Sequence, residues 1–244
     1  MTTLLNHPAS PLELLGRLSE GARMDAARIV AGPAPAGPAA PVTGRGLEGH
    51  PITIAPTSMP LAGLGRVLEE RQSHRFYDGR PVRADILTAA LQRAVQYDSD
   101  VWGTDPENGT GLQIVVAALN LDGLPPALYR FDAAAASYTP LAPLDHAQVA
   151  QMVLQMEYAD APVIIATMGS LSRALESWGD HGERALNQRA AHFSYTALLT
   201  ANAYGVDGSV FAGFLPSGLS QSLVADGYHL GQVFALALGH RALP

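Results

Sequence analysis

Hydrophobic and polar residues along the chain follow both helical and strand-like spacings, which predicts a mixed fold. Apolar residues recur every three or four positions between residues 61 and 68 and again between 86 and 94, as on one face of a helix. A longer helix is expected from about Glu183 to Tyr204, with Gly205 as the residue that ends it. Its many alanines would let neighbouring backbones approach closely, which suits the centre of a dimer and equally a buried helix in a monomer.

Strands are indicated by apolar runs that lie between turn residues. Leu112–Leu121 is bounded by Asn-Gly and Asp-Gly turns, and the runs at 127–131 and 137–141 have the pattern of a hairpin. Further elements complete the pattern: strands at 161–168, 206–211 and 232–238, and helices at 145–156 and 219–225. We therefore expect an α+β fold in which helices flank a central, mostly antiparallel sheet.

The first 50 residues differ from the rest of the chain. Residues 10–30 have the spacing of a short amphipathic helix, and Gly32–Pro41 is a Pro/Ala/Gly tract that favours neither a helix nor a strand ladder. The apolar pattern restarts near Ile52 and continues to the end. The sequence thus predicts an N-terminal helix with a Pro/Ala-rich linker (1–50), which could recruit partners, and one folded domain (51–244).

Composition narrows the possible functions. The chain has 244 residues, 48% of them hydrophobic and only 15% charged, with a formal net charge of −7, which argues against nucleic acid as a partner. No apolar run reaches the roughly 18–20 residues of a membrane span, and we expect a cytoplasmic protein. Cysteine is absent and the histidines lack metal-ligand spacing, so we expect no metal site.

A short polar run between the first two predicted helices carries candidate chemistry. In Arg71-Gln72-Ser73-His74-Arg75 two guanidiniums flank a hydroxyl. Such groups together can bind a phosphate, because Arg offers paired planar donors and Ser adds a short one. A solvated surface run is the plainer interpretation of the same pattern.

Several motifs, taken in order, resemble one family. Arg71–Phe76 resembles an Arg-Ser-x-Arg-Phe signature, Pro106–Gly109 a Pro-Ser-x-Gly turn, and Gly123–Asp132 a Gly-Leu-Pro-x-Gly-Leu-Tyr-x-Tyr-Asp hairpin. Gly182-Glu183-Arg184 resembles the Gly-Glu-Arg start of a helix in the same family, and Leu236–Arg241 resembles its closing segment. Residues 52–244 are thereby similar to the flavin-dependent nitroreductase superfamily, most closely to its SagB-type branch, the azoline dehydrogenases that finish thiazole- and oxazole-containing peptides.

The resemblance implies an FMN held between the two subunits of a homodimer. Arg71, Ser73 and Arg75 would bind its phosphate, and Arg241 would add a further cation from the other end of the domain. Two distant segments that supply like charges to one place make sense if an anion lies between them. Asn108, Gly109 and Gly213 would bring their backbone close to the flavin ring. Arg184 would reach the flavin or pair with a carboxylate.

The same resemblance implies oxidation of an azoline to an azole, with a hydride passed to the flavin N5 and a proton to a base. Where the branch carries a Lys-Tyr pair for the proton, this chain has Asp180 and His181. His181 could act as the base with Asp180 beside it. Alternatively, Asp180 caps the following helix and His181 faces solvent.

Three functions remain open at this point. The first is an FMN-dependent dehydrogenase in peptide natural-product biosynthesis, acting on a peptide or small-molecule substrate, with a cyclodehydratase complex as its partner. The second is an NAD(P)H-dependent nitro- or ene-reductase that uses the same pocket in the opposite direction. The third is a non-catalytic scaffold subunit, which the missing Lys-Tyr pair favours and the retained arginines disfavour.

Overall fold

A single large sheet organises the chain. The structure is a computed structural model, and it describes residues 10–21, 26–46, 48–58, 62–103 and 111–242. Within these residues the strand order is β1-β6-β5-β3-β7-β9-β8, with every neighbouring pair antiparallel. The strands are β1 (Ile52–Thr53), β3 (Gln113–Ala118), β5 (Ala127–Asp132), β6 (Ser137–Pro143), β7 (Val163–Gly169), β8 (Asp207–Phe211) and β9 (Gly231–Gly239). A short parallel pair joins β2 (Val82–Arg83) to β4 (Leu121–Asp122).

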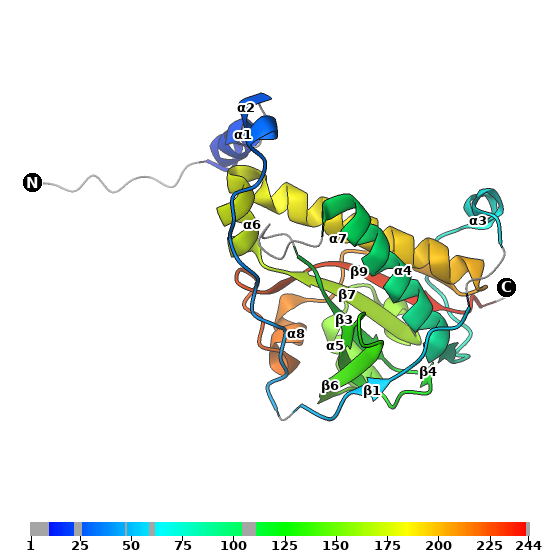
Figure 1. Cartoon of the computed structure of the whole chain (residues 1–244). Helices are drawn as coiled ribbons and strands as arrows, with labels where there is room; N and C mark the ends of the chain where they lie inside the picture. Colours follow the sequence, from blue (N-terminus) through cyan, green and yellow to red (C-terminus); the bar gives the residue numbers. More distant parts are fainter. Residues whose placement is uncertain (1–9, 22–25, 47, 59–61, 104–110, 243–244) are drawn as a thin grey trace, which may run out of the picture.

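Helices cover both faces of the sheet (Figure 1). On one face α4 (Ala84–Trp102) and α7 (Gly182–Ala203) pack on each other and on residues such as Val116 and Ile165. On the other face α5 (His146–Met152) and α8 (Pro216–Ser222) pack on the side chains that alternate with these along the strands, such as Val115 and Ile164. Because both faces of β7 are covered, every one of its residues is buried. This explains why the strand has a continuous apolar pattern.

The remaining helices lie at the ends of α7. α6 (Leu171–Trp178) and the 3₁₀ turn η3 (Gly179–His181) lead into its start, while α3 (Leu64–Glu70) contacts α7 and lies near its other end in Figure 1. A second 3₁₀ turn, η2, spans Met156–Asp160. The N-terminal helices α1 (Pro11–Gly21) and α2 (Ala26–Ala31) stand near α6 in Figure 1.

The Pro/Ala-rich tract runs along the domain as a strap, which we define as residues 32–46. Ala34 N–H donates to the Ser177 carbonyl at 2.8 Å, and Val224 N–H donates to the Thr43 carbonyl at 2.9 Å. Val42 is completely buried in the core on the α5/α8 side. The tract lacks regular structure, as expected, but its backbone is held by the domain; the domain boundary at residue 50 stays a prediction.

The expected α+β class and mostly antiparallel sheet are confirmed, and some local expectations are wrong. Asp145 does cap α5, through reciprocal hydrogen bonds with Gln148, but the helix ends at Met152 rather than 156. α8 lies three residues earlier than expected. α6 was not expected at all. Of the apolar residues predicted to line one face at 61–68, Leu64 and Leu68 are 62% and 47% exposed, and Leu61 lies outside the described residues.

Candidate functional site

The segment that follows α3 pairs with two distant parts of the chain. His74 N–H donates to the Gly208 carbonyl at 3.1 Å, Asp78 N–H to the His240 carbonyl at 2.9 Å, and Ala242 N–H to the Phe76 carbonyl at 3.1 Å. These bonds bring the first candidate motif beside the C-terminal residues of the last strand. These backbone hydrogen bonds explain why Arg71 and Arg241, which are far apart in the sequence, lie near each other.

A pocket of about 580 Å³ lies where these segments meet, between α3, the end of α7 and the C-terminal residues. We call it the cationic pocket, because the described residues that line it include five basic and two acidic side chains: Arg66, Arg71, Arg80, His240 and Arg241, with Glu70 and Asp207. Asn202, Ala203 and Gly205 line it from the end of α7. The excess of guanidiniums predicts an anionic ligand.

The arginines of the cationic pocket differ in how far they are neutralised. Arg66 pairs with Glu70 at 2.8 Å, and Arg80 pairs with Asp78 at 2.6 Å. Arg241 Nε lies 3.9 Å from an Asp207 carboxylate oxygen. In the part of the chain that the structure describes, no carboxylate lies within ion-pair distance of Arg71, whose guanidinium only reaches the Ser73 hydroxyl at 3.5 Å. Arg71 is thus the cation best placed to take an added anion.

The other two residues of the first motif do not line the pocket. Ser73 is exposed and reaches it only through Arg71. Arg75 turns away and lies 3.3 Å from Glu157 in η2. In their place the pocket holds Arg66, Arg80 and His240, which the sequence pattern did not single out. His240 could have been predicted from the sequence, because it is next to Arg241. Arg80 could not, because only the tertiary fold places it at the pocket.

Gly213 lies beyond the end of β8 in a conformation that favours glycine, with φ at +110°. The Gln232 side chain occupies the space beside it: the amide donates to the Ala212 carbonyl and accepts from Phe214 N–H, both at 2.8 Å. A Cβ at Gly213 would lie 2.1 Å from the Gln232 amide nitrogen. The positive φ already favours a glycine here, and an approach to a flavin ring stays a prediction. Asn108 and Gly109 lie outside the described residues.

Asp180, His181 and Arg184 lie together at the opposite end of α7. Asp180 and Arg184 are exposed, whereas His181 is 1% exposed. Neither ring nitrogen of His181 has a hydrogen-bond partner among the described residues. The alternative of an Asp180 cap with a solvent-facing His181 is wrong for this chain, because His181 itself precedes the helix, without a side-chain cap, and is buried.

The N-terminal segment covers the turn that carries His181. α1 contacts η3, and the strap is fixed to α6 by the Ala34–Ser177 hydrogen bond and by the Arg173 guanidinium, which donates to the Ala36 carbonyl at 2.9 Å. A buried polar side chain without partners is uncommon in folded proteins. His181 is therefore the most conspicuous buried polar group at this end of the molecule.

A buried ion pair ties the same half of α7 to α4. Arg189 donates to both carboxylate oxygens of Asp98, at distances of 2.7 to 3.1 Å, and both side chains are less than a tenth exposed. The guanidinium carbon also lies 6.0 Å from the centre of the Trp102 ring. The pair was not expected from the sequence, since its partners lie on two helices far apart in the chain.

The two groups of candidates are separated by almost the whole of α7. From His181 to Asn202, at about 1.5 Å of rise per residue, the helix extends for roughly 30 Å. One FMN molecule is considerably shorter than this. The cationic pocket and the His181 end of the same chain therefore cannot both contact one flavin.

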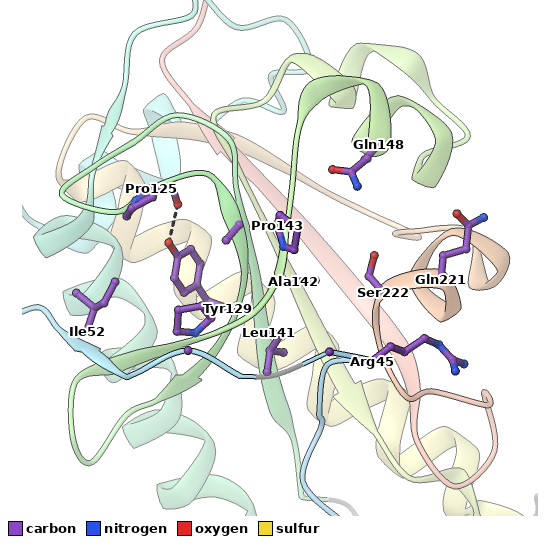
Figure 2. Close-up of a pocket in the computed structure, with 14 residues that line it drawn as sticks. Arg45, Ile52, Pro125, Tyr129, Leu141, Ala142, Pro143, Gln148, Gln221 and Ser222 are labelled. Atoms are coloured by element: carbon purple, nitrogen blue, oxygen red, sulfur yellow. Dashed lines mark hydrogen bonds between the residues drawn. The ribbon is translucent and has the colours of Figure 1, made fainter.

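A more apolar pocket of about 700 Å³ lies on the other side of the molecule, between the β5–β6 hairpin, α8, residues 45–46 and residues 49–52 (Figure 2). Ile52, Pro125, Tyr129 and Leu141 form much of its wall, and the Tyr129 hydroxyl donates to the Pro125 carbonyl at 2.6 Å. Among the described residues that line it, Arg45 is the one with a charged side chain. Its described lining contains no carboxylate and no histidine, so we place the candidate site at the cationic pocket.

The donor set of the cationic pocket fits the phosphate end of FMN. Arg71 and Arg241 come from the two segments named for that role, and Arg80 and His240 add further donors on the same wall. Asp207 and Glu70 oppose an anion, but each already has a basic neighbour. The described residues of one chain supply no equally clear site for the flavin ring beside this pocket.

The fold is that of the nitroreductases. A protein from Anabaena variabilis named as a nitroreductase matches with a TM-score of 0.72 at 20% identity, over 98% of this chain and 49% of its own, so the chain spans about half its length. One from Staphylococcus epidermidis, named as an NAD(P)H:FMN oxidoreductase, matches with a TM-score of 0.52 at 14% identity, over 78% and 92%. A chain of the Escherichia coli microcin synthetase McbBCD complex with truncated pro-MccB17 bound matches with a TM-score of 0.59 at 14% identity, over 77% and 76%.

Sequence comparison adds no closer relative. No protein-family model matches the chain, and no curated protein is significantly similar to it. Among the described residues no helix has the length and apolar character needed to cross a membrane, and no cluster of three or more His, Asp or Glu side chains could hold a metal ion.

Proposed function

We propose that this protein is an FMN-dependent oxidoreductase whose flavin lies between two copies of the chain. The observation that carries the proposal is the convergence of Arg71 and Arg241 on one pocket, with Arg71 lacking a carboxylate partner among the described residues. Concentrated positive charge at one place in an acidic protein is unfavourable unless an anion compensates it. The phosphate of FMN is such an anion.

The assembly from two copies follows from the length of α7. If both groups of candidates serve one flavin, the His181 end must come from a second copy whose α7 runs in the opposite direction. A twofold axis across α7 produces this arrangement and gives two identical sites. The phosphate would be bound by Arg71 and Arg241 of one protomer, while Asp180, His181 and Arg184 of its partner would face the reacting end. Asn108, Gly109 and Gly213 are kept as candidates for backbone contacts with the ring.

The specific reaction that we propose is oxidation of an azoline in a modified peptide. Bound FMN would accept a hydride at N5. His181 would take the proton, which requires it to become accessible to the substrate, and Asp180 is kept as a candidate beside it in the sequence. Support for a peptide substrate and for a cyclodehydratase partner comes from the motif resemblance and from the shared fold with a chain of a microcin synthetase complex.

An NAD(P)H-dependent nitro- or ene-reductase is the second candidate. The observation in its favour is the replacement of the expected Lys-Tyr pair by Asp180 and His181. A fold neighbour named as an NAD(P)H:FMN oxidoreductase is consistent with it. Comparison of one flavin-loaded preparation in two assays separates the candidates: oxidation of an azoline peptide by oxygen, and steady NAD(P)H consumption with a nitroarene.

The cofactor is tested first, by FMN titration followed through flavin fluorescence. A hydrogen bond to a charged group contributes about 1.5–3 kcal/mol, so Arg71→Gln should raise the dissociation constant about 10- to 150-fold. Arg93→Gln, which removes an exposed arginine of α4 outside the pocket, should leave it unchanged. Wild-type protein that binds no FMN would overturn the proposal and favour a non-catalytic scaffold.

His181 is tested separately in the flavin-loaded protein. His181→Asn should bind FMN as the wild type does and lose turnover with the azoline peptide. Unchanged turnover would remove His181 from the mechanism while leaving the cofactor assignment intact.

A further inference from the structure

Three leucines of α1 are exposed to solvent. Leu12 is 79% exposed, Leu15 is 59% exposed and Leu14 is 48% exposed. The start of the helix is nevertheless well formed, since Ser10 and Glu13 exchange side-chain to backbone hydrogen bonds at 2.7 and 3.2 Å. An isolated helix of this length is only marginally stable in water. An exposed apolar stripe on it therefore indicates a surface that another chain covers.

The second helix with an unpartnered apolar face is α3. Leu64 is 62% exposed and Leu68 is 47% exposed, whereas Val67 on an adjacent face of the helix is buried. α3 is thus anchored to its own chain through one face and presents leucines on another. With only seven residues, α3 would be even less stable as an isolated helix than α1.

These two helices occupy opposite ends of α7. α1 contacts η3, which leads directly into the start of α7, while Arg66, Val67 and Glu70 of α3 line the cationic pocket together with Asn202 and Ala203 at its end. Figure 1 shows both helices on the side of the α4–α7 layer that faces away from the sheet. Within one chain they therefore cannot cover each other.

We propose that α1 of each protomer docks its leucines on the exposed leucines of α3 in the partner. The proposal rests on the proposed function, because the divided flavin site requires two chains whose α7 helices run in opposite directions. The same twofold axis that carries the partner's His181 end to the cationic pocket also carries the partner's α1 to α3. One symmetry operation thus covers both apolar faces and completes the site.

The contact would connect the interface to the chemistry. α3 is followed directly by Arg71, the least neutralised arginine of the cationic pocket, and α1 contacts the turn that contains Asp180 and His181. The two docked helices would hold the phosphate-binding end of one protomer beside the proton-handling end of the other. We therefore infer that the N-terminal helix belongs to the assembled site, although the resemblance covers only residues 52–244.

The absence of cysteine from the chain allows a direct test. In the full-length double variant Leu15→Cys/Leu64→Cys, a short bis-maleimide cross-linker should produce a covalent dimer on a denaturing gel. Each single variant should remain monomeric on the gel, since a twofold axis keeps identical helices at opposite ends. Leu15→Cys/Val224→Cys is the matched control, because Val224 is 53% exposed but follows α8 on the other face of the sheet.

Light scattering on the same samples separates this inference from the proposed function. A dimer in solution that gives no covalent product with the Leu15/Leu64 pair would overturn the docking of α1 on α3 and leave the two-copy site standing. A monomer that binds FMN would overturn both the docking and the divided site. As a second measurement, Leu12→Ser/Leu15→Ser should raise the dimer dissociation constant at least about tenfold through lost apolar burial; an unchanged constant would also overturn the docking.

Discussion

Removal of the Arg189 guanidinium should destabilise the protein far more than removal of an exposed arginine. In Arg189→Met the Asp98 carboxylate keeps its place between α4 and α7, where its side chain is only 9% exposed, but loses its charged partner. Leaving a buried charge without its partner typically costs about 3–5 kcal/mol. The two guanidinium nitrogens that bind the carboxylate, at distances of 2.7 to 3.1 Å, place this pair at the strong end of such interactions.

Urea unfolding followed by far-ultraviolet circular dichroism measures the change. Urea is preferable to guanidinium chloride, because a salt would screen the charges under test. With a slope of about 3 kcal/mol per molar urea, the expected loss moves the midpoint down by about 1–2 M. Protein concentration must be kept constant, since assembly would contribute to the apparent stability.

The double variant Asp98→Leu/Arg189→Met decides whether the orphaned charge is the cause. It removes both charges and keeps apolar volume between the helices, so it should recover most of the lost stability. Should the double variant prove as unstable as Arg189→Met, the loss would come from packing of the arginine stem and the Trp102 contact, and the electrostatic reasoning would be refuted.

Three further predictions concern stability. Gly208→Ala should cost about 1–3 kcal/mol, because its Cβ would lie 2.4 Å from the Ala237 carbonyl oxygen, whereas Gly65→Ala in α3, with open space around it, should stabilise by about 0.5–1 kcal/mol; thermal midpoints of the two compare them. Tyr138→Phe removes a buried 2.9 Å hydrogen bond to Thr88, which keeps its bond to the Ala84 carbonyl, and should cost about 1 kcal/mol in urea unfolding. The His229 side chain and nearby backbone N–H groups hold the pKa of Asp226 well below its usual range. The carboxylate therefore stabilises the fold above the unfolded pKa of about 3.9, and this contribution disappears as pH falls through the folded pKa. Asp226→Asn should be less stable than wild type at pH 6, and the difference should shrink below pH 4.

The long helix α7 was predictable from the sequence, whereas the course of the strap was not. α7 begins and ends within one residue of its expected bounds, because Gly205 ends it at a positive φ of +76°. The strap has no helical or strand-like spacing of apolar residues. Its backbone hydrogen bonds go to side chains such as Gln113 and to separate loops. Its course could not follow from local sequence.

The candidate site shows the same division. Arg71 and Arg241 were predicted and do line one pocket, but Arg75 turns to Glu157, a carboxylate more than eighty positions away that no local pattern points to. Gly213 was expected to make room for a flavin, and the structure places the Gln232 amide beside it. A local motif identifies residue types, whereas their partners depend on tertiary contacts.

The hydrogen bonds from residues 74–78 to Gly208 and His240 have a consequence for how the protein folds. They close a loop that contains most of the sheet, and such a closure carries a large entropic cost before its contacts form. The cationic pocket should therefore be among the last regions to become ordered during folding, and an anion bound there would stabilise the whole domain rather than one loop. At a ligand concentration one hundred times its dissociation constant, this linkage would add about 2.7 kcal/mol to the free energy of unfolding. Occupancy of the pocket would thus also report that the chain has completed its fold.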